Sequence, residues 1–203
     1  EGVLGELNAA QRKALERIME GSRRLTRMVR NVLDYAQLAS GRLALVPETV
    51  DLTELVRTSL EAERVQWMKK GLHLDSSLPE TAVPAWGDPA RIEQVLGEIL
   101  DNAIKFTPDG GKIRVTLSSE GDQATVEIQD SGAGIPSEAL PHLFEPFYQF
   151  DLTSTRRFGG MGLGLAIVRH LIEGMGGCLS IQSSLGRGTT VRFTLRKVPG
   201  IIS

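Results

Sequence analysis

Three polar side chains, Glu98, Asn102 and Lys105, follow one another at steps of four and three residues. If the segment is helical, these steps place a carboxylate, an amide oxygen and an ammonium group on one face. An amide oxygen suits Mg²⁺, which keeps several waters and bridges phosphates, and a lysine suits phosphate charge. The pattern indicates either a site for a metal-bound phosphate or, read alone, an ordinary solvated helix face.

A first glycine-rich stretch runs from Asp130 to Pro136 and reads DSGAGIP, after a segment that alternates like a β-strand. Glycines let the backbone approach a ligand closely. An aspartate at the end of a strand can accept a hydrogen bond from a ligand amine such as the N6 group of adenine. A tight turn with a capping aspartate is the alternative interpretation.

A second glycine-rich stretch runs from Gly159 to Leu165, reads GGMGLGL and opens a predicted helix. Backbone N–H groups at the N-terminus of a helix favour anions, and Arg156 and Arg157 come just before it. It is not a Rossmann fingerprint, because Leu165 stands where the third glycine belongs. It is not a Walker A loop either, because no Gly-Lys-Ser/Thr follows.

Between these two stretches, residues Phe144 to Gln149 read FEPFYQ, with three aromatic side chains in five positions. Such a cluster either packs locally or anchors one edge of a mobile loop. The polar segment from Asp151 to Gly160 would be that loop, a lid that becomes ordered with nucleotide.

Composition excludes several classes of protein. The 203 residues are 41% hydrophobic and 24% charged, and the net charge of −2 gives no global footprint for nucleic acid. A lone cysteine, Cys178, excludes an internal disulfide and suits a reducing compartment. No apolar run approaches the roughly 20 residues that span a bilayer. We expect a cytoplasmic location without membrane contact by this segment, whether the whole protein is cytosolic or a membrane-bound sensor.

The first 40 residues have the pattern of one long helix. Apolar residues from Leu15 to Ala36 recur at alternating steps of three and four, a heptad seam with Ser22 as its polar member. A stripe of this kind needs a partner surface. The helix should end at Ser40-Gly41, with Gly41 as a left-handed cap. Eight basic residues against three acidic ones between Gln11 and Arg42 indicate either a solvated face or a docking surface for an acidic partner.

The remaining pattern mixes helices and strands. We expect helices over Leu52–Lys69, Asp88–Phe106 and Leu163–Gly174, and strands over Leu72–Leu78, Lys112–Ser119, Gln123–Asp130, Leu179–Ser183 and Thr190–Arg196. Asp88 should cap its helix, with Pro89 at the first helical position. The triplet EGD after Ser119 predicts a hairpin.

Taken in order, the four clusters resemble the N, G1, F and G2 boxes of the Bergerat ATP-binding fold, and residues 186–190, GRGTT, resemble its final glycine box. Histidine kinases, gyrase-type topoisomerases, Hsp90 chaperones and MutL mismatch-repair proteins share that fold. The match covers about residues 48 to 196. Upstream, Asn8 to Pro47, especially RMVRNVLD from Arg27, resembles the second helix of the histidine-kinase dimerisation hairpin. The sequence therefore resembles the sensor histidine kinases of two-component systems.

The resemblance implies an α+β fold, a two-layer α/β sandwich preceded by one long amphipathic helix of a helical hairpin. It implies two parts: residues 1–47, the second hairpin helix and linker, and residues 48–203, the catalytic ATP-binding domain. The pocket would be made by helices and loops over one face of an antiparallel sheet.

The resemblance also implies the ligands, ATP and Mg²⁺. Asn102 would coordinate the metal, Lys105 would contact the phosphates, Asp130 would read the adenine amine and Thr189 would close the base pocket. The nucleotide-binding residues implied are Asn102, Lys105, Phe106, Asp130, Gly132, Gly134, Ile135, Tyr148, Gly160, Gly162, Leu163, Gly164, Leu165 and Thr189. Arg156 and Arg157 would supply the positive charge of the lid during catalysis.

Three positions depart from the common family pattern. Met161 stands where threonine is frequent, and it should not remove the backbone donors because it lies between glycines. Glu98 stands where asparagine is frequent: it could activate water, accept the proton of an attacking imidazole, or orient waters around Mg²⁺. Gln149 stands where many members carry arginine, which leaves the positive charge of the lid to Arg156 and Arg157.

By resemblance, the chain would transfer the γ-phosphoryl group of ATP to a histidine, for relay to an aspartate in a response-regulator receiver domain. The full-length protein would be a homodimer. The phosphoacceptor segment is absent: His73, His142 and His170 lack its following residues. We therefore expect a fragment that cannot autophosphorylate. An ATP-binding module without kinase activity is the alternative, and the heptad helix argues against a serine kinase of the same fold.

Overall fold

The computed structural model describes residues 7–150 and 161–198 and divides into two compact units, Glu1–Leu43 and Ala44–Ser203. The division falls a few residues before the predicted boundary at 47/48. The end of the predicted linker, residues 44–47, belongs to the second unit, where the Val46 N–H donates to the Asp88 carboxylate at 2.9 Å. The assignment of residues 1–47 to a dimerisation hairpin stays a prediction.

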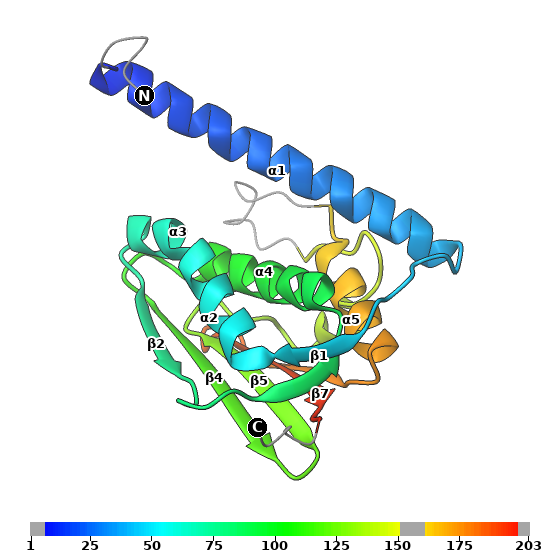
Figure 1. Ribbon diagram of the computed structural model, residues 1–203. Coiled ribbons are helices and arrows are strands. Elements are labelled where there is room, and N and C mark those ends of the chain that lie inside the picture. The colour runs from blue at the N-terminus through cyan, green and yellow to red at the C-terminus, as the bar shows by residue number, and fades with distance from the viewer. Residues whose placement is uncertain (1–6, 151–160, 199–203) are drawn as a thin grey trace. The chain divides into compact units, whose positions relative to one another are not determined.

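The first unit is one helix, α1 (Ala9–Ala39), labelled in Figure 1. A reciprocal capping box between Asn8 and Gln11 begins it. Gly41, with φ 66°, ends it, and the Arg42 N–H donates to the Gln37 carbonyl at 2.8 Å. The predicted left-handed cap is confirmed. Seven apolar side chains of the predicted stripe are between 41% and 66% exposed: Leu15, Ile18, Met19, Leu25, Val29, Val32 and Leu33.

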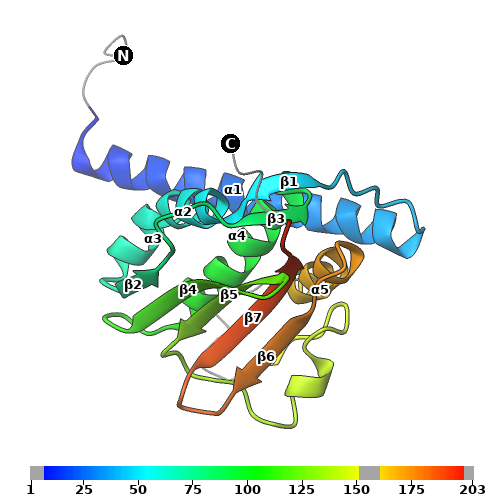
Figure 2. The same cartoon turned by 60° about the horizontal axis from the view of Figure 1, so that its bottom comes forward.

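The second unit is built on a five-stranded sheet in the order β2-β4-β5-β7-β6, and Figure 2 shows these strands side by side. The strands are β2 (His73–Ser77), β4 (Lys112–Glu120), β5 (Gln123–Asp130), β6 (Leu179–Ser183) and β7 (Thr189–Arg196). The expectation of an antiparallel sheet is wrong at one edge, where β2 runs parallel to β4 with Leu74 opposite Ile113. The chain crosses from β2 to β4 through a helix, and a helical crossover returns it in the same direction.

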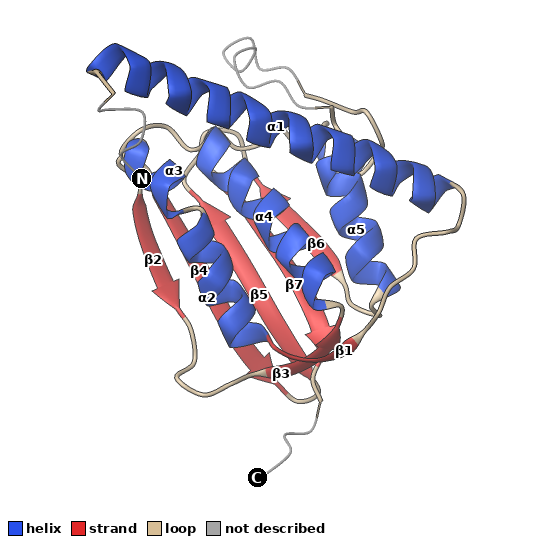
Figure 3. Ribbon diagram, turned by 45° about the horizontal axis from the view of Figure 1, so that its top comes forward, coloured by secondary structure: helices blue, strands red, loops and turns tan. Residues whose placement is uncertain are grey.

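Helices α2 (Leu52–Ala62), α4 (Pro89–Phe106) and α5 (Gly164–Gly174) cover one face of this sheet (Figure 3). The predicted single helix over Leu52–Lys69 is interrupted at Glu63, after which α3 (Arg64–Lys69) begins. Glu63 has φ −91° and ψ 2°, yet its N–H still bonds to the Ser59 carbonyl. The interruption is a one-residue departure without glycine or proline, so the sequence does not mark it.

A small second sheet pairs β1 (Glu48–Asp51) with β3 (Pro84–Gly87), with Val50 opposite Ala85. Neither strand was predicted, because four residues are too few for an alternating pattern to stand out. A short 3₁₀ turn, η1 (Leu140–His142), was not predicted either.

The core lies between the helices and the sheet. The predicted inner face of α4 is confirmed, since its apolar residues are buried: Ile92, Val95, Leu96, Ile99, Leu100 and Ala103. They pack beside α5, which buries Ile167, Val168, Leu171 and Ile172. In the part of the chain that the structure describes, no helix is both long and apolar enough to cross a membrane.

Candidate nucleotide site

Helix α4 positions the first group of predicted site residues. The Asp88 carboxylate accepts from the Arg91 N–H at 3.2 Å, and Pro89 occupies the first turn, so the predicted start is confirmed. With the apolar face buried, Glu98, Asn102 and Lys105 are half-buried on the remaining surface. The Lys105 ammonium lies 4.7 Å from the centroid of the Phe106 ring, which places positive charge beside an exposed aromatic face.

Asp130 ends β5 and forms the centre of the second group. One carboxylate oxygen, Oδ1, accepts from the Gly132 N–H at 2.7 Å and from the Thr189 N–H at 3.2 Å. Burial raises the pKa of the Asp130 carboxyl above its ordinary value, and these two N–H groups oppose part of that rise. The structure thus brings the first glycine stretch and the final glycine box together around one partly buried carboxylate.

Gly134 is required where the first glycine stretch meets the turn between β6 and β7. Its φ is 68°, and a Cβ atom there would lie 2.0 Å from the backbone oxygen of Ser184. The Gly186 N–H donates to the Ala133 carbonyl at 2.7 Å, which fastens the two loops together. A side chain at position 134 would therefore separate them.

Ser183 was missed by sequence reasoning and joins the same cluster. Its hydroxyl oxygen accepts from the Ile135 N–H at 2.8 Å and lies 3.0 Å from the Thr189 hydroxyl. It also donates to the Gly188 carbonyl at 2.8 Å. The register of the β6–β7 hairpin could have indicated this, because it places Ser183 directly opposite the predicted site residue Thr189.

The opposite end of the site lies where α5 begins. A Cβ atom at Gly164 would be 2.4 Å from Glu98 Oε2, so the Glu98 carboxylate lies against the first turn of α5. A Cβ atom at Gly162 would be 2.6 Å from the Tyr148 carbonyl oxygen, which ties the second glycine stretch to the aromatic cluster. Glu98 is thus brought to the second glycine stretch, and its proposed catalytic role stays a prediction.

Two leucines of the second glycine stretch differ in their surroundings. The Leu163 side chain is only 1% exposed and belongs to the core, so it can offer a nucleotide only its backbone. The Leu165 side chain is half-exposed on the first turn of α5.

The aromatic cluster has no shared core of its own. The Tyr148 ring lies beside the His142 ring, with centroids 5.3 Å apart, and the Phe144 ring lies 5.2 Å from the Arg169 guanidinium carbon. Phe147 is 62% exposed and has φ 66°, and its N–H donates to the Gly162 carbonyl at 2.9 Å. The cluster therefore contacts the second glycine stretch through the backbone bond from Phe147 to Gly162, and the predicted contact of Tyr148 with nucleotide stays a prediction.

Several predicted site residues lie outside the described residues. Arg156, Arg157 and Gly160 belong to this group, as does the predicted lid from Asp151 to Gly160.

The donor set of the site can be tested against the implied Mg²⁺. Within residues 7–150 and 161–198 no cluster of three or more histidine, cysteine or acidic side chains could hold a metal by itself. Asn102 lies one helical turn from Glu98, and Mg²⁺ typically takes one or two protein oxygens together with waters and phosphates. The residues fit a metal that enters with a phosphate ligand.

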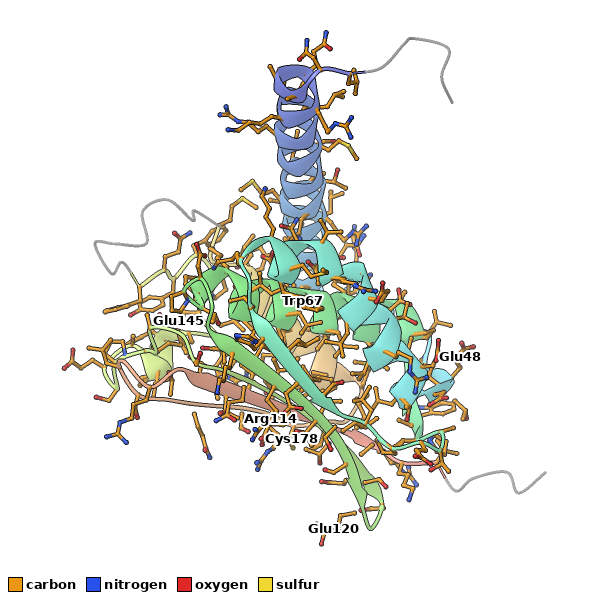
Figure 4. All side chains as sticks on the ribbon, turned by 90° about the vertical axis from the view of Figure 1, so that its left-hand side faces the viewer. Glu48, Trp67, Arg114, Glu120, Glu145 and Cys178 are labelled. Atoms are coloured by element: carbon orange, nitrogen blue, oxygen red, sulfur yellow. The ribbon has the colours of Figure 1, made fainter. Side chains whose placement is uncertain are left out.

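A separate groove of about 670 Å³ includes exposed side chains on the sheet face opposite the helices, among them Asp75, Lys112 and Arg114. Figure 4 labels Arg114 on β4 and Glu120 at the tip of the β4–β5 hairpin. Among the nucleotide-binding residues that the structure describes, only Asp130 borders this groove, and its carboxylate is bonded to Gly132 and Thr189. The other described residues assigned to the nucleotide do not line this groove.

Comparison with known proteins identifies the family. A family model described as histidine kinase-, DNA gyrase B-, and HSP90-like ATPase matches residues 87–199. The chain belongs to this ATPase family. Over 190 residues it is 34% identical to the circadian input-output histidine kinase CikA of Synechococcus elongatus, covering 93% of this chain and 25% of CikA.

Two solved structures extend this similarity. The mycobacterial sensor histidine kinase MprB is 31% identical with a TM-score of 0.64, over 76% of this chain and 100% of that chain. Full-length ShkA in complex with AMPPNP is 29% identical with a TM-score of 0.76, over 96% of this chain and 40% of ShkA. The predicted fold and the resemblance to sensor histidine kinases are confirmed. The chain spans about a quarter of the length of the curated relatives it matches.

Proposed function

We propose that this chain binds ATP with Mg²⁺ and forms the catalytic part of a sensor histidine kinase. The observation that carries the proposal is the Asp130 carboxylate, held by the Gly132 and Thr189 N–H groups at the meeting point of two glycine-rich loops. A carboxylate in this setting can accept a hydrogen bond from the adenine amine. Guanine carries a carbonyl oxygen at the corresponding ring position, so the site favours adenine over guanine.

The other end of the site fits the phosphates. Lys105 supplies positive charge on the surface of α4, and the first turn of α5 offers backbone N–H groups to an anion. Arg156 and Arg157 are proposed to add positive charge from the predicted lid. A bound Mg²⁺ would neutralise phosphate charge, with Asn102 as its protein ligand and Glu98, one helical turn away on α4, as the group that would orient its waters.

The reaction that this arrangement serves is phosphoryl transfer to a histidine on a helix outside this chain. A nitrogen of that histidine forms the new N–P bond, the bond between the γ-phosphorus and its bridging oxygen breaks, and ADP leaves. The proton of the imidazole passes to a base, for which Glu98 is the candidate on α4. The phosphoryl group then moves to an aspartate of a response-regulator receiver domain.

None of the three histidines of this chain lies on a hairpin helix of the kind that would carry the phosphoacceptor. His73 lies in β2, His142 in η1 and His170 in α5. We propose that the chain binds ATP without labelling itself. An acid-labile phosphate on this chain alone would contradict that statement.

We also propose that the full-length protein is a homodimer in the cytoplasm, with α1 in its dimer interface. The exposed apolar stripe of α1 supports this, because seven half-exposed apolar residues on one helix need a partner surface. Sedimentation equilibrium should show self-association that weakens when Val29 and Leu33 are replaced by aspartate. A strict monomer at all concentrations would count against the interface.

The experiment for the proposed function is labelling in trans. The chain is mixed with a longer chain that carries a histidine-bearing hairpin helix and with γ-labelled ATP. Labelling of that histidine, dependent on Mg²⁺ and on this chain, is expected. ATP binding without any labelling would instead favour the alternative, a nucleotide-binding module that works through contacts with partners.

A further inference from the structure

The C-terminal turn of α4 leaves backbone carbonyls that need partners, as every helix end does. The first of them, on Ala103, accepts from the Thr107 N–H at 3.1 Å and from the Thr107 hydroxyl at 2.6 Å. The last, on Phe106, accepts from the Ala133 N–H at 3.4 Å. The two carbonyls between them, on Ile104 and Lys105, accept from a residue that is distant in the sequence, Lys70.

Lys70, the C-cap residue of α3, supplies donors to these two carbonyls. Its ammonium group donates to the carbonyl of Ile104 at 2.7 Å, to that of Lys105 at 3.3 Å and to that of Thr107 at 2.5 Å. Lys70 follows α3, three residues after Trp67, which Figure 4 labels. The Lys70 carbonyl accepts from the Gly110 N–H at 3.0 Å. Lys70 therefore bonds to the loop after α4 through its main chain, at Gly110, and through its side chain, at Thr107.

The charge of Lys70 also suits this place. The C-terminus of a helix carries partial negative charge, and a cation there stabilises the last turn. Burial lowers the pKa of the Lys70 ammonium, opposed by the nearby Asp109. The charged form is therefore partly desolvated in the folded chain, a cost that the three carbonyl oxygens offset.

The turn that Lys70 holds is the one that bears the candidate site. It contains Lys105 and Phe106. The Phe106 carbonyl oxygen contacts the first glycine-rich stretch, Asp130–Pro136, which we call the adenine loop: a Cβ atom at Gly132 would lie 2.7 Å from that oxygen. The connection continues after the helix, where the Lys112 N–H donates to the Ser131 hydroxyl at 2.8 Å and the Ser131 N–H donates to the Lys112 carbonyl at 2.9 Å. The adenine loop is therefore bonded both to the end of α4, at Phe106, and to the start of β4, at Lys112.

We propose that Lys70 is a positioning residue of the nucleotide site, which fixes the last turn of α4 and, through the Phe106 carbonyl, the adenine loop. It does not touch the nucleotide in this account. The inference rests on the proposed function, because it assigns a role toward the same bound ATP.

The first test is affinity for Mg·ATP, measured by calorimetry at a temperature where circular dichroism shows every variant fully folded. Lys70→Met keeps an unbranched side chain close to the length of the lysine stem and removes the ammonium donors. We expect affinity about tenfold weaker or worse, since small displacements of positioning groups have large effects. Lys69→Met, the same change at the exposed last residue of α3, should stay within about twofold of wild type.

Local hydrogen exchange is the second readout. In Lys70→Met without nucleotide, amides of residues 103–111 and 130–135 should exchange faster, while amides of β6 and α2 stay unchanged. Lys70→Arg keeps the charge and N–H donors and should recover part of both the affinity and the protection. Were Lys70→Met unable to fold, Lys70→Gln would take its place, with affinity at least about threefold weaker expected.

The outcomes separate the two proposals. Absence of Mg·ATP binding by the wild-type chain overturns the proposed function. The exchange pattern of Lys70→Met then decides by itself whether Lys70 fixes the end of α4 and the adenine loop. Wild-type affinity in Lys70→Met or its replacement, with or without a lower melting temperature, overturns the positioning role. So does faster exchange spread evenly over the whole domain, which would indicate ordinary loss of stability.

Discussion

The two ends of the candidate site are built in different ways. At the adenine end, Asp130 Oδ1 already accepts from two backbone N–H groups, and Ser183 joins the loops around it. At the phosphate end, Glu98 meets Gly164 across helices, and the predicted lid residues lie outside the described chain. In the proposed function, bonds within the folded domain hold Asp130 ready for the base, whereas the phosphate charge is neutralised by the Mg²⁺ that would enter with the nucleotide.

The largest expected effect is at the phosphate end. Asn102→Ala removes the proposed Mg²⁺ ligand and should lower labelling in trans by at least about 100-fold. Because the adenine end is untouched, affinity for adenosine should stay at the wild-type level. Glu93→Ala, at an exposed position of the same helix, is the matched control and should retain labelling. Loss of adenosine binding in Asn102→Ala would mean that the two ends are not separable.

The next effect is at the adenine end. Gly134→Ala places a Cβ atom against the Ser184 backbone and requires φ near 68°. The left-handed conformation alone costs a residue with a side chain about 1–2 kcal/mol. We expect a lower melting temperature and at least about tenfold weaker binding of both adenosine and ATP. Gly97→Ala on α4 is the control, because no atom lies within 4 Å of its added Cβ.

A smaller effect concerns pH. Burial raises the pKa of the Asp130 carboxyl above its ordinary value of 3.8. At a pH above the raised pKa, the buried carboxylate lowers the free energy of unfolding. This loss of stability disappears as the pH falls from the raised pKa toward the ordinary value. The ionised carboxylate is the stronger acceptor for the adenine amine, so ATP affinity should fall over the same acidic range, by at most about tenfold per pH unit. Asp130→Asn, measured in parallel, accounts for protonation of ATP itself. Identical pH profiles for the two proteins would contradict this assignment.

Much of this site could be predicted from sequence because the signals are local. The spacing of Glu98 and Asn102 sets their helix face, and Asp130 follows a strand with regular alternation. The contribution of Lys70 had no such signal, since it depends on three carbonyls more than 30 positions away in the chain. The parallel pairing of β2 and the short strands β1 and β3 were missed for a related reason: pairing across the fold decides them, and periodicity within four or five residues does not.

The proposed function depends most directly on recognition of adenine by Asp130. Calorimetry of the wild-type chain and of Asp130→Ala with Mg·ATP and Mg·GTP tests it. The wild type should bind ATP much more tightly than GTP, and Asp130→Ala should bind ATP about 5- to 150-fold more weakly, the range for one buried hydrogen bond. Equal wild-type affinity for ATP and GTP, or unchanged ATP affinity in Asp130→Ala, would contradict it.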